Sequence, residues 1–369
     1  MCKRIMAAQT NTDCGVPFYK IGTIGGKADA YISKELFDEY KMKYSFPRKG
    51  EVMITCAGTV GKCIIYNGED SYYQDSNIVW IDNPNKVITN GFLYHSLCKV
   101  NWSYLNSTTI VRIYNDDLRN LKLYIPQHDE QKKIAKLFSL LDERIATQNK
   151  VIEKLESLIK GIADKLLCNY SWEKVYLRSF MEFYPTNSFS WEQLSYEKGT
   201  IRNLHYGLIH SILTKSIATK TLPFISSNKE DSRFVCCQNG DVAFADASED
   251  TADIGKAVEF TDVDKTNVVC GLHTIHGRDI KGLTVTGFKG FIFNSSYFHE
   301  QVRRVAQGTK VFSISANNLS SCYVYIPNKS EQTKITGFLQ AMEMQLSLSR
   351  KLLERYKTQK AHLLRQMFI

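Results

Sequence analysis

Tyr124-Ile125-Pro126, Glu130-Gln131 and Lys133-Ile134 are written twice in this chain, and they return as Tyr325-Ile326-Pro327, Glu331-Gln332 and Lys334-Ile335. The offset of 201 residues shrinks upstream: Gly61-Lys62 matches Gly255-Lys256 at 194, and Gly50-Glu51-Val52 matches Gly240-Asp241-Val242 at 190. Thr108 aligns with Thr309 at the full offset. Matches that keep their order while the offset drifts indicate an internal duplication with loop insertions in the second copy.

Each copy leads into a long amphipathic helix. From Ile134 onward, apolar residues follow at alternating steps of four and three, which is typical of a coiled-coil seam. We predict a helix over 130–167 with Asp129 as its N-cap, and a second helix with Ser330 as the equivalent N-cap. Such a helix is too long to be covered by one domain, so the two seams are expected to pack on each other.

The expected helix-pair interface consists of the seam positions of both copies, which are Ile134, Phe138, Leu141, Ile145, Gln148, Ile152, Leu155, Ile335, Leu339, Met342, Leu346, Ser349 and Leu353. Two of these are polar at the same register, Gln148 and Ser349, and they either set the register inside the pair or face solvent. Lys360 falls on the seam further along and is predicted to fray that end of the pair.

The part of each copy before its helix is rich in short runs of β-branched and aromatic residues. We predict strands over 51–55, 62–66, 77–81, 241–245 and 267–275, because Gly, Asn and Asp separate these runs. The predicted fold class is therefore α+β and internally duplicated, with two globular domains separated by two long antiparallel coiled-coil helices in pseudo-twofold symmetry. The expected boundaries are 1–126, 127–170, 171–327 and 328–369. A strand-like run, 172–177, opens the second copy and has no counterpart in the first, so either the first domain is trimmed at its N-terminus or the chain begins at a late start.

Composition narrows the class of protein. The chain of 369 residues carries 47 Lys+Arg against 38 Asp+Glu, a net charge of +9 that favours a polyanionic partner. The 12% aromatic content excludes a largely disordered chain. No run approaches the roughly 18 apolar residues of a membrane span, and the ten cysteines contain no C-x-x-C pair, so we expect a cytoplasmic protein without a membrane partner.

The order of these motifs resembles a known family. Leu118-x-x-Leu121-x-Leu123-x-Ile125-Pro126 followed by Glu130-Gln131 and a seamed helix is similar to the specificity (S) subunit of type I restriction-modification systems. The segments Gly50-Glu51-Val52 and Gly58-Thr59-Val60-Gly61-Lys62 resemble that family's target recognition domains.

The resemblance implies a DNA-binding subunit without catalysis of its own. Each recognition domain would read one half of a bipartite, asymmetric site in double-stranded DNA. The helices would set the spacing and dock two modification (methyltransferase) subunits, and restriction (motor-nuclease) subunits would join them. S-adenosylmethionine, ATP and magnesium are expected on those partner subunits and no cofactor on this chain.

Motifs for catalysis are incomplete. Asn83-Pro84-Asn85-Lys86 lacks the second proline and the aromatic residue of an adenine methyltransferase motif. The glycine-rich run 22–28 lacks the spacing and the Ser or Thr of a phosphate-binding loop, and Asp129-Glu130-Gln131-Lys132 is interpreted as a helix start. His273 and His276 are placed on opposite faces of one strand, which is poor geometry for a metal, so no catalytic or metal residue is predicted.

DNA would be contacted by basic and amide side chains on loops, through phosphates and through base edges in the major groove. The predicted set is Arg48, Lys49, Lys62, Tyr73, Gln74 and Asn77 in the first domain, and Asn239, Lys256, His273, Arg303, Arg304 and Lys310 in the second. The alternative function is a coiled-coil scaffold or adaptor that does not bind DNA. A steep fall of binding with salt would distinguish the two.

Overall fold

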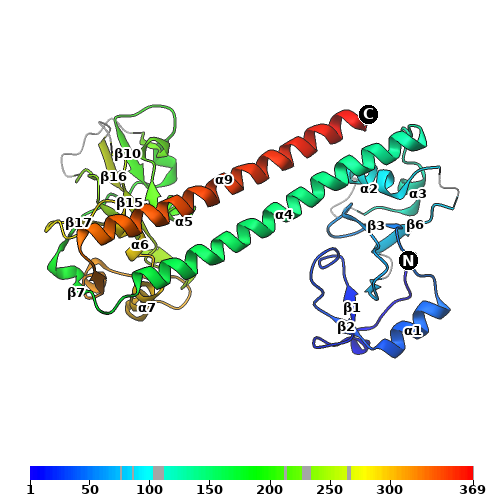
Figure 1. The fold of residues 1–369 in the computed structure, drawn as a ribbon, viewed down its shortest axis with the longest axis horizontal. Coiled ribbons are helices and arrows are strands. Elements are labelled where there is room, and N and C mark those ends of the chain that lie inside the picture. Colours follow the sequence, from blue (N-terminus) through cyan, green and yellow to red (C-terminus); the bar gives the residue numbers. More distant parts are fainter. Residues whose placement is uncertain are drawn as a thin grey trace. The chain divides into compact units, whose positions relative to one another are not determined.

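The chain folds into two compact units, each containing one globular part and one half of each of two long helices (Figure 1). The computed structural model describes residues 1–74, 77–84, 87–102, 112–211, 214–226, 234–263 and 267–368. Unit 1 comprises residues 1–150 and 351–369, and unit 2 comprises residues 151–350. The two long helices are α4 (His128–Leu167) and α9 (Lys329–Met367).

Unit 1 contains two small sheets. The sheets have the strand orders β2-β1-β5 and β4-β3-β6. The elements are β1 (Val16–Tyr19), β2 (Tyr31–Ile32), α1 (Lys34–Lys43), β3 (Val52–Thr55), β4 (Cys63–Ile65), β5 (Tyr72–Tyr73), β6 (Ile78–Ile81), α2 (Asn90–Lys99) and α3 (Asn115–Arg119). Thr108, one of the repeated positions, lies outside the described residues.

Unit 2 is larger and contains a four-stranded sheet, β16-β10-β12-β9, and a five-stranded sheet, β11-β15-β13-β17-β8. Two pairs, β14-β18 and β19-β7, lie beside them. The strands are β7 (Glu173–Tyr176), β8 (Met181–Tyr184), β9 (Leu194–Ser195), β10 (Ile201–Leu204), β11 (Ser216–Ile217), β12 (Phe224–Ile225), β13 (Val242–Ala245), β14 (Ala247–Ser248), β15 (Ala257–Phe260), β16 (Asn267–Cys270), β17 (Thr274–Asp279), β18 (Phe312–Ser313) and β19 (Tyr323–Ile326). The helices are α5 (Tyr206–Ser211), α6 (Phe288–Ile292), α7 (Ser296–Val305) and α8 (Ala316–Ser320).

The duplication extends to strand register. In unit 1, β3 pairs antiparallel with β6 so that Val52 faces Ile81, and in unit 2, β13 pairs with β17 so that Val242 faces Gly277. In both units the other edge of this strand pairs with the next strand of a hairpin, β4 or β15. The predicted α+β, internally duplicated fold class is therefore confirmed.

One predicted strand is two strands. The expected run 267–275 is divided into β16 and β17 by a turn, in which His273 has a left-handed φ of 54°. His273 therefore lies outside any strand, whereas His276 is buried on β17. The expectation that both belong to one strand was wrong, because hydrophobicity alone does not show where a chain leaves one sheet and enters another.

The repeated Glu-Gln motif has a structural role that is the same in both units. The Gln131 side chain accepts a hydrogen bond from the Thr89 amide at 2.6 Å and donates to the carbonyls of Val87 and Pro126. Gln332 repeats this arrangement with the amide of Val285 and the carbonyls of Leu283 and Pro327. Both glutamine side chains are buried. Each fastens the start of a long helix to a loop of its own globular part.

The predicted N-caps were placed too late. Helix α4 begins at His128, so Asp129 lies inside its first turn, where its negative charge interacts favourably with the helix dipole. Helix α9 begins at Lys329, and Asn328, not Ser330, caps it by accepting from the Glu331 amide at 3.0 Å.

The seam residues are buried or half-buried in both helices. In unit 1, the cluster that contains Phe138 also contains Phe92 of α2 and Phe368 at the end of α9. In unit 2, Ile335 and Leu339 belong to the main core of the globular part. The ends of the seams therefore pack on their own domains as well as on the other long helix.

The polar seam residues and Lys360 are accommodated inside the helix pair. Ser349 is buried and Gln148 is half-buried, which argues against the solvent-facing alternative. The Lys360 ammonium donates a hydrogen bond to the carboxylate of Asp142 in unit 1. The prediction that Lys360 frays the pair was wrong, because its charge has an acidic partner on α4. In unit 2, Arg350 pairs with Glu156 at 2.6 Å, and the two pairs together fit antiparallel helices.

One sheet edge is covered in unit 2 and open in unit 1. Strand β19 pairs with β7, and Val175 of β7 is buried. The equivalent segment of unit 1, residues 122–125, forms no strand in the described part of the chain, and Tyr124 is 80% exposed. A groove of about 470 Å³ lies beside it, with Val100 and Phe368 in its lining.

A buried histidine makes unit 1 sensitive to acid. His95 of α2 is 3% exposed and packs against Phe138 at 5.0 Å between ring centroids. Burial lowers the pKa of His95 to about 4. Because the unfolded chain binds this proton near pH 6.5 and the folded chain does not, stability is full above pH 6.5 and falls as the pH drops toward 4.

We expect acidification from about pH 7.5 to about pH 4.5 to remove about 2–3 kcal/mol of unit 1 stability through His95. Hydrogen exchange of α2 peptides measures this loss. In His95→Phe, which carries no proton and keeps the aromatic contact, the acid-dependent increase in exchange should shrink. An equal increase in both proteins would contradict the assignment to His95.

None of the helices in the described residues is both long and apolar enough to cross a membrane.

Candidate nucleic-acid interface

A lysine beside a short turn occurs at the same place in both units. In unit 1, Lys62 follows the hairpin loop that leaves β3, and its side chain lies alongside Gly25 in the turn after β1. In unit 2, Lys256 follows the equivalent hairpin loop, and its ammonium donates to the His210 carbonyl of α5 at 2.9 Å. We call each arrangement a lysine–turn site.

The backbone of the two lysine–turn sites is held by the same hydrogen bonds. The Gly61 amide donates to Thr55 and the Thr55 amide to Lys62, at 2.9 and 3.0 Å. In unit 2 the amide of Gly255 donates to Ala245 and the amide of Ala245 to Lys256, at 3.0 and 2.9 Å. Gly61 and Gly255 both have left-handed φ angles, and a Cβ there would collide with Trp102 and Val302. The duplication therefore preserves the frame that presents each lysine.

The site in unit 2 carries a cluster of aromatic, histidine and charged side chains. Its residues come from the turns before β9, β15 and β17, from the end of β13 and from α5 with the residue before it. They are Trp191, His205, Tyr206, His210, Asp246, Lys256 and His273. The Tyr206 ring lies 4.7 Å from His205, 5.9 Å from His210 and 5.3 Å from His273, between ring centroids. Trp191 is 46% exposed, so part of this cluster faces solvent.

Two interactions set the charge of the cluster. His205 is buried, and burial together with the charge of His273 lowers its pKa, so it is neutral. The half-exposed His273 ring pairs with the Asp246 carboxylate at 3.1 Å. Burial raises the pKa of Asp246, although His273 opposes this shift. The surface thus offers a lysine, an imidazole held by a carboxylate, and aromatic faces.

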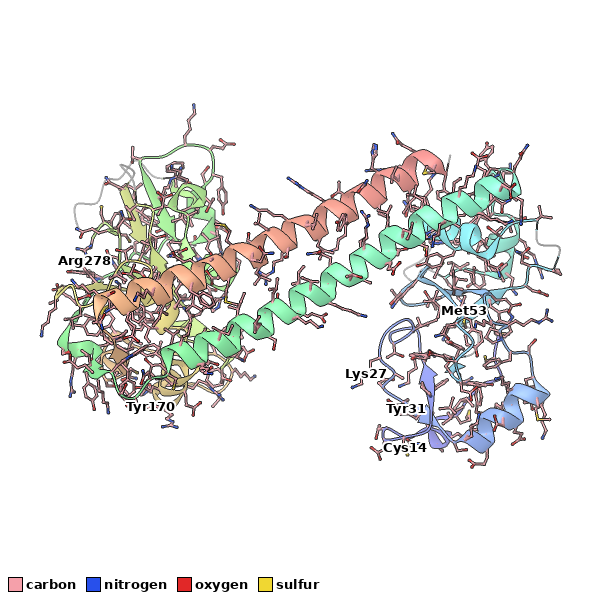
Figure 2. All side chains as sticks on the ribbon, viewed as in Figure 1. Cys14, Lys27, Tyr31, Met53, Tyr170 and Arg278 are labelled. Carbon is pink, nitrogen blue, oxygen red and sulfur yellow. The ribbon has the colours of Figure 1, made fainter. Side chains whose placement is uncertain are left out.

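The site in unit 1 has the same frame and different side chains. The Gln74 amide donates to the Tyr19 carbonyl, as the Gly271 amide donates to Leu204 in unit 2. The Gln74 side chain accepts from the Ile21 amide at 3.2 Å and holds the turn beside Lys62. Lys27, on the same β1–β2 connection, is exposed (Figure 2).

Comparison with known proteins identifies the chain's relatives. Residues 1–157 match the family described as the type I restriction modification DNA specificity domain. A putative type I restriction enzyme specificity subunit of Haemophilus influenzae is 48% identical over 160 residues, which are 43% of this chain and 41% of that protein. The first part of the chain is therefore similar to type I specificity subunits. The type I restriction enzyme MjaVIII specificity subunit of Methanocaldococcus jannaschii is 37% identical over 95 residues, 25% of this chain and 22% of that protein. The chain thus spans less than half the length of these curated relatives.

The fold of the whole chain is similar to the folds of two solved chains. The crystal structure of the S subunit of a type I restriction-modification system from M. genitalium has a TM-score of 0.59 at 14% identity and covers 100% of this chain and 92% of that one. A chain from a structural study of complex assembly and conformational transition of the type I system has a TM-score of 0.56 at 13% identity, covering 96% and 91%. At this identity the likeness concerns the fold.

Several of the residues predicted to contact DNA serve the fold instead. Tyr73 is buried and stacks on Tyr19 at 5.8 Å, and burial raises its pKa to about 12, so its ring is withdrawn from any ligand. Gln74 is engaged with the Ile21 amide, and the half-buried Asn77 accepts a backbone bond from Cys56. Asn239 is exposed, but its side chain accepts from the Val263 amide at 2.7 Å.

The remaining predicted residues lie on the surface. Arg48 and Lys49 are exposed at the turn before β3. Arg303 and Arg304 follow Val302, which packs against Gly255 of the lysine–turn site, and both pair with Glu300 on α7. Lys310 is exposed beyond α7. Their unit 1 equivalents fall after Trp102 and lie outside the described residues.

The sequence motifs that lacked catalytic features have structural roles. The run 22–28 lies in a turn between two strands, β1 and β2, whereas a phosphate-binding loop leads into a helix. The helix-start interpretation of residues 129–132 is confirmed by α4. Asn83 donates to the Ile88 carbonyl and to Asn90, and Asn85 and Lys86 lie outside the described residues.

Sequence reasoning missed the aromatic half of the unit 2 site. Trp191, His205, Tyr206 and His210 were not among the predicted contacts. The signal present was the density of rings in Leu204-His205-Tyr206-Gly207 and at His210, aligned with the Gly-rich turn beside Lys62.

Proposed function

We propose that this chain is a sequence-specific DNA-binding specificity subunit of a type I restriction-modification complex, in which each unit reads one half of a bipartite, asymmetric site in double-stranded DNA. The observation that carries the proposal is the pair of lysine–turn sites. One backbone frame occurs twice and carries different side chains, Lys27 in unit 1 but His273 and Tyr206 in unit 2. Two readers with one geometry and different chemistry are suited to two different half-sites.

Contacts to DNA divide by chemistry. Lys62, Arg303 and the other exposed cations, together with the half-buried Lys256, would meet phosphates, which supply affinity and fix the register. His273, which Asp246 orients, would meet base edges in the major groove, where donor and acceptor patterns differ between base pairs.

The long helices would dock the modification subunits. Large apolar side chains lie outside the seams and remain exposed, including Leu137 and Leu140 in unit 1 and Phe338 and Leu348 in unit 2. Exposed apolar rows of this kind mark protein interfaces. Restriction subunits would join the same complex. The cofactors S-adenosylmethionine, ATP and magnesium would be bound by those partners, and this chain would act in the cytoplasm without catalysis of its own.

Methylation mapping tests the proposal. The chain would be co-expressed with the modification subunit encoded beside it, and methylated adenines would be located by single-molecule sequencing. A split, asymmetric methylated site is the expected result. A stable complex that methylates no such site would refute the two-reader proposal, and no complex together with no DNA binding would favour the scaffold.

The lysine in unit 1 gives a salt-dependent prediction. Lys62→Ala is expected to weaken DNA binding and to reduce the slope of log affinity against log salt by about 1, since one phosphate contact is lost. Lys43→Ala, which removes an exposed lysine paired with Glu39 on α1, is the matched control and should leave the slope unchanged. Equal slopes in all three proteins would remove Lys62 from the interface.

A further inference from the structure

Three potential metal ligands meet in the interior of unit 2. Cys237 precedes β13, Cys270 ends β16 and His276 lies on β17, and all three side chains are buried. Their ligand atoms lie within 4.8 Å of one another, and the two sulfur atoms are 3.6 Å apart. The sequence alone did not indicate this group, because its residues are distant along the chain and His276 was considered only together with His273 as a candidate metal ligand.

The imidazole of His276 is oriented as in metal sites. Its Nε2 atom lies 2.8 Å from the Asp241 carboxylate, whereas its Nδ1 atom is buried and has no hydrogen-bond partner. Asp241 also accepts two hydrogen bonds from Arg278, at 2.8 and 2.7 Å, and therefore stays charged (Figure 2 labels Arg278). A carboxylate that holds one imidazole nitrogen in its protonated form leaves a lone pair on the other, which is the usual arrangement behind a metal-bound histidine.

We propose that Cys237, Cys270 and His276 form a binding site for a thiolate-preferring divalent cation, of which Zn²⁺ is the common biological case. Two thiolates on a tetrahedral zinc, each at about 2.3 Å, are about 3.7 Å apart, close to the separation seen here. Binding would release one proton from each thiol to solvent, and the two thiolates would neutralise the cation. The Asp241–Arg278 pair adds no net charge. A small ligand such as water would complete the fourth position.

The site would fasten two sheets together. Cys270 belongs to the four-stranded sheet and His276 to the five-stranded sheet, and the turn between them carries His273. Bound metal would thus stiffen the turn that presents His273, a consequence that rests on the proposed function. The site itself does not. In unit 1, the register of β3 and β6 places Trp80 where unit 2 has His276, so the described residues of unit 1 do not repeat the site.

Cobalt binding to the full chain tests the proposal without DNA. The protein would be purified reduced and metal-free and titrated with Co²⁺, with the thiolate-to-cobalt charge-transfer absorption as the readout. We expect one Co²⁺ per chain, displaced by one Zn²⁺. Cys237→Ser, Cys270→Ser and His276→Gln should each abolish or greatly weaken the absorption. Cys322→Ser, at a buried cysteine in another core cluster of unit 2, should retain it.

A second measurement on the unmodified chain covers variants that fail to fold. Under reducing conditions, Zn²⁺ should protect two of the ten cysteines, Cys237 and Cys270, from alkylation and should raise the thermal midpoint. Absence of the absorption in the unmodified chain, or identical alkylation with and without Zn²⁺, would overturn the site. Because neither readout involves DNA, a negative result would refute the metal site and leave the proposed function unaffected.

Discussion

Replacing Glu259 by glutamine is expected to destabilise unit 2 by about 3–5 kcal/mol. Glu259 on β15 is fully buried, and its carboxylate accepts from the amides of Gly287 and Gly290 at 2.8 Å. The Lys289 ammonium lies 3.2 Å away and is itself buried. Burial raises the pKa of Glu259, opposed by Lys289 and the two amides. Removing the negative charge leaves a buried ammonium without its counter-ion, which costs far more than the loss of a surface pair.

Hydrogen exchange of peptides from β13, β15 and β17 measures this effect within unit 2. Glu300→Gln is the matched control, because Glu300 pairs with Arg303 and Arg304 at the exposed surface of α7, and a change within about 0.5 kcal/mol is expected. The double variant Glu259→Gln, Lys289→Met should recover part of the loss, because it removes the stranded charge. A single variant as stable as the parent would show that the pair contributes nothing to unit 2.

Exchanging residues 171–327 for the second recognition domain of another specificity subunit is expected to change one half of the methylated site completely and leave the other half unaltered. The physical reason is that the lysine–turn site of unit 2 is built entirely from residues inside that range, whereas Lys62 and its turn are built from residues of unit 1. Methylation mapping of the hybrid, co-expressed with the same modification subunit, measures both halves at once.

The junction of the hybrid must keep the helix fastened to its domain. The Gln332 side chain forms hydrogen bonds with the Val285 amide and with the carbonyls of Leu283 and Pro327. The inserted domain therefore has to provide an amide and two carbonyls at the positions equivalent to these. The reciprocal exchange of residues 1–126 is the control and should change the other half-site only. If either exchange altered both halves, independent reading by two units would be wrong.

The two long helices and the strands β3, β4, β6 and β13 followed from local patterns, whereas the remaining short elements were not predicted and several errors came from long-range contacts. Periodicity placed the seams because burial every three to four residues is a local property. It could not anticipate that Lys360 meets Asp142, 218 residues away, or that Tyr73 is buried where β5 pairs with β1. The N-caps were misplaced because the buried glutamine of each repeat, and not the acidic or hydroxyl residue before it, fastens the helix start.

Only the backbone hairpins of the candidate DNA surface could be predicted from the sequence. Repeated glycines identified the hairpins that carry Lys62 and Lys256, since left-handed backbone and close packing require glycine in both. The rings around Tyr206 gave no periodic signal because α5 spans only six residues. Their convergence with His273 depends on the parallel pairing of β10 with β16, which no local pattern displays.

The uncovered edge in unit 1 bears on the solubility of the chain. Residues 122–125 form no strand in the described part of the chain, so their backbone groups could pair with another polypeptide, and the exposed Tyr124 ring adds apolar surface there. Lys122 begins this segment and Pro126 follows it. The charge of the lysine and the lack of a backbone N–H in the proline both discourage the addition of a strand. In unit 2 the equivalent segment, β19, is paired with β7. At high concentration, aggregation of this chain should therefore begin in unit 1, at residues 122–125, and it should be limited by Lys122 and Pro126.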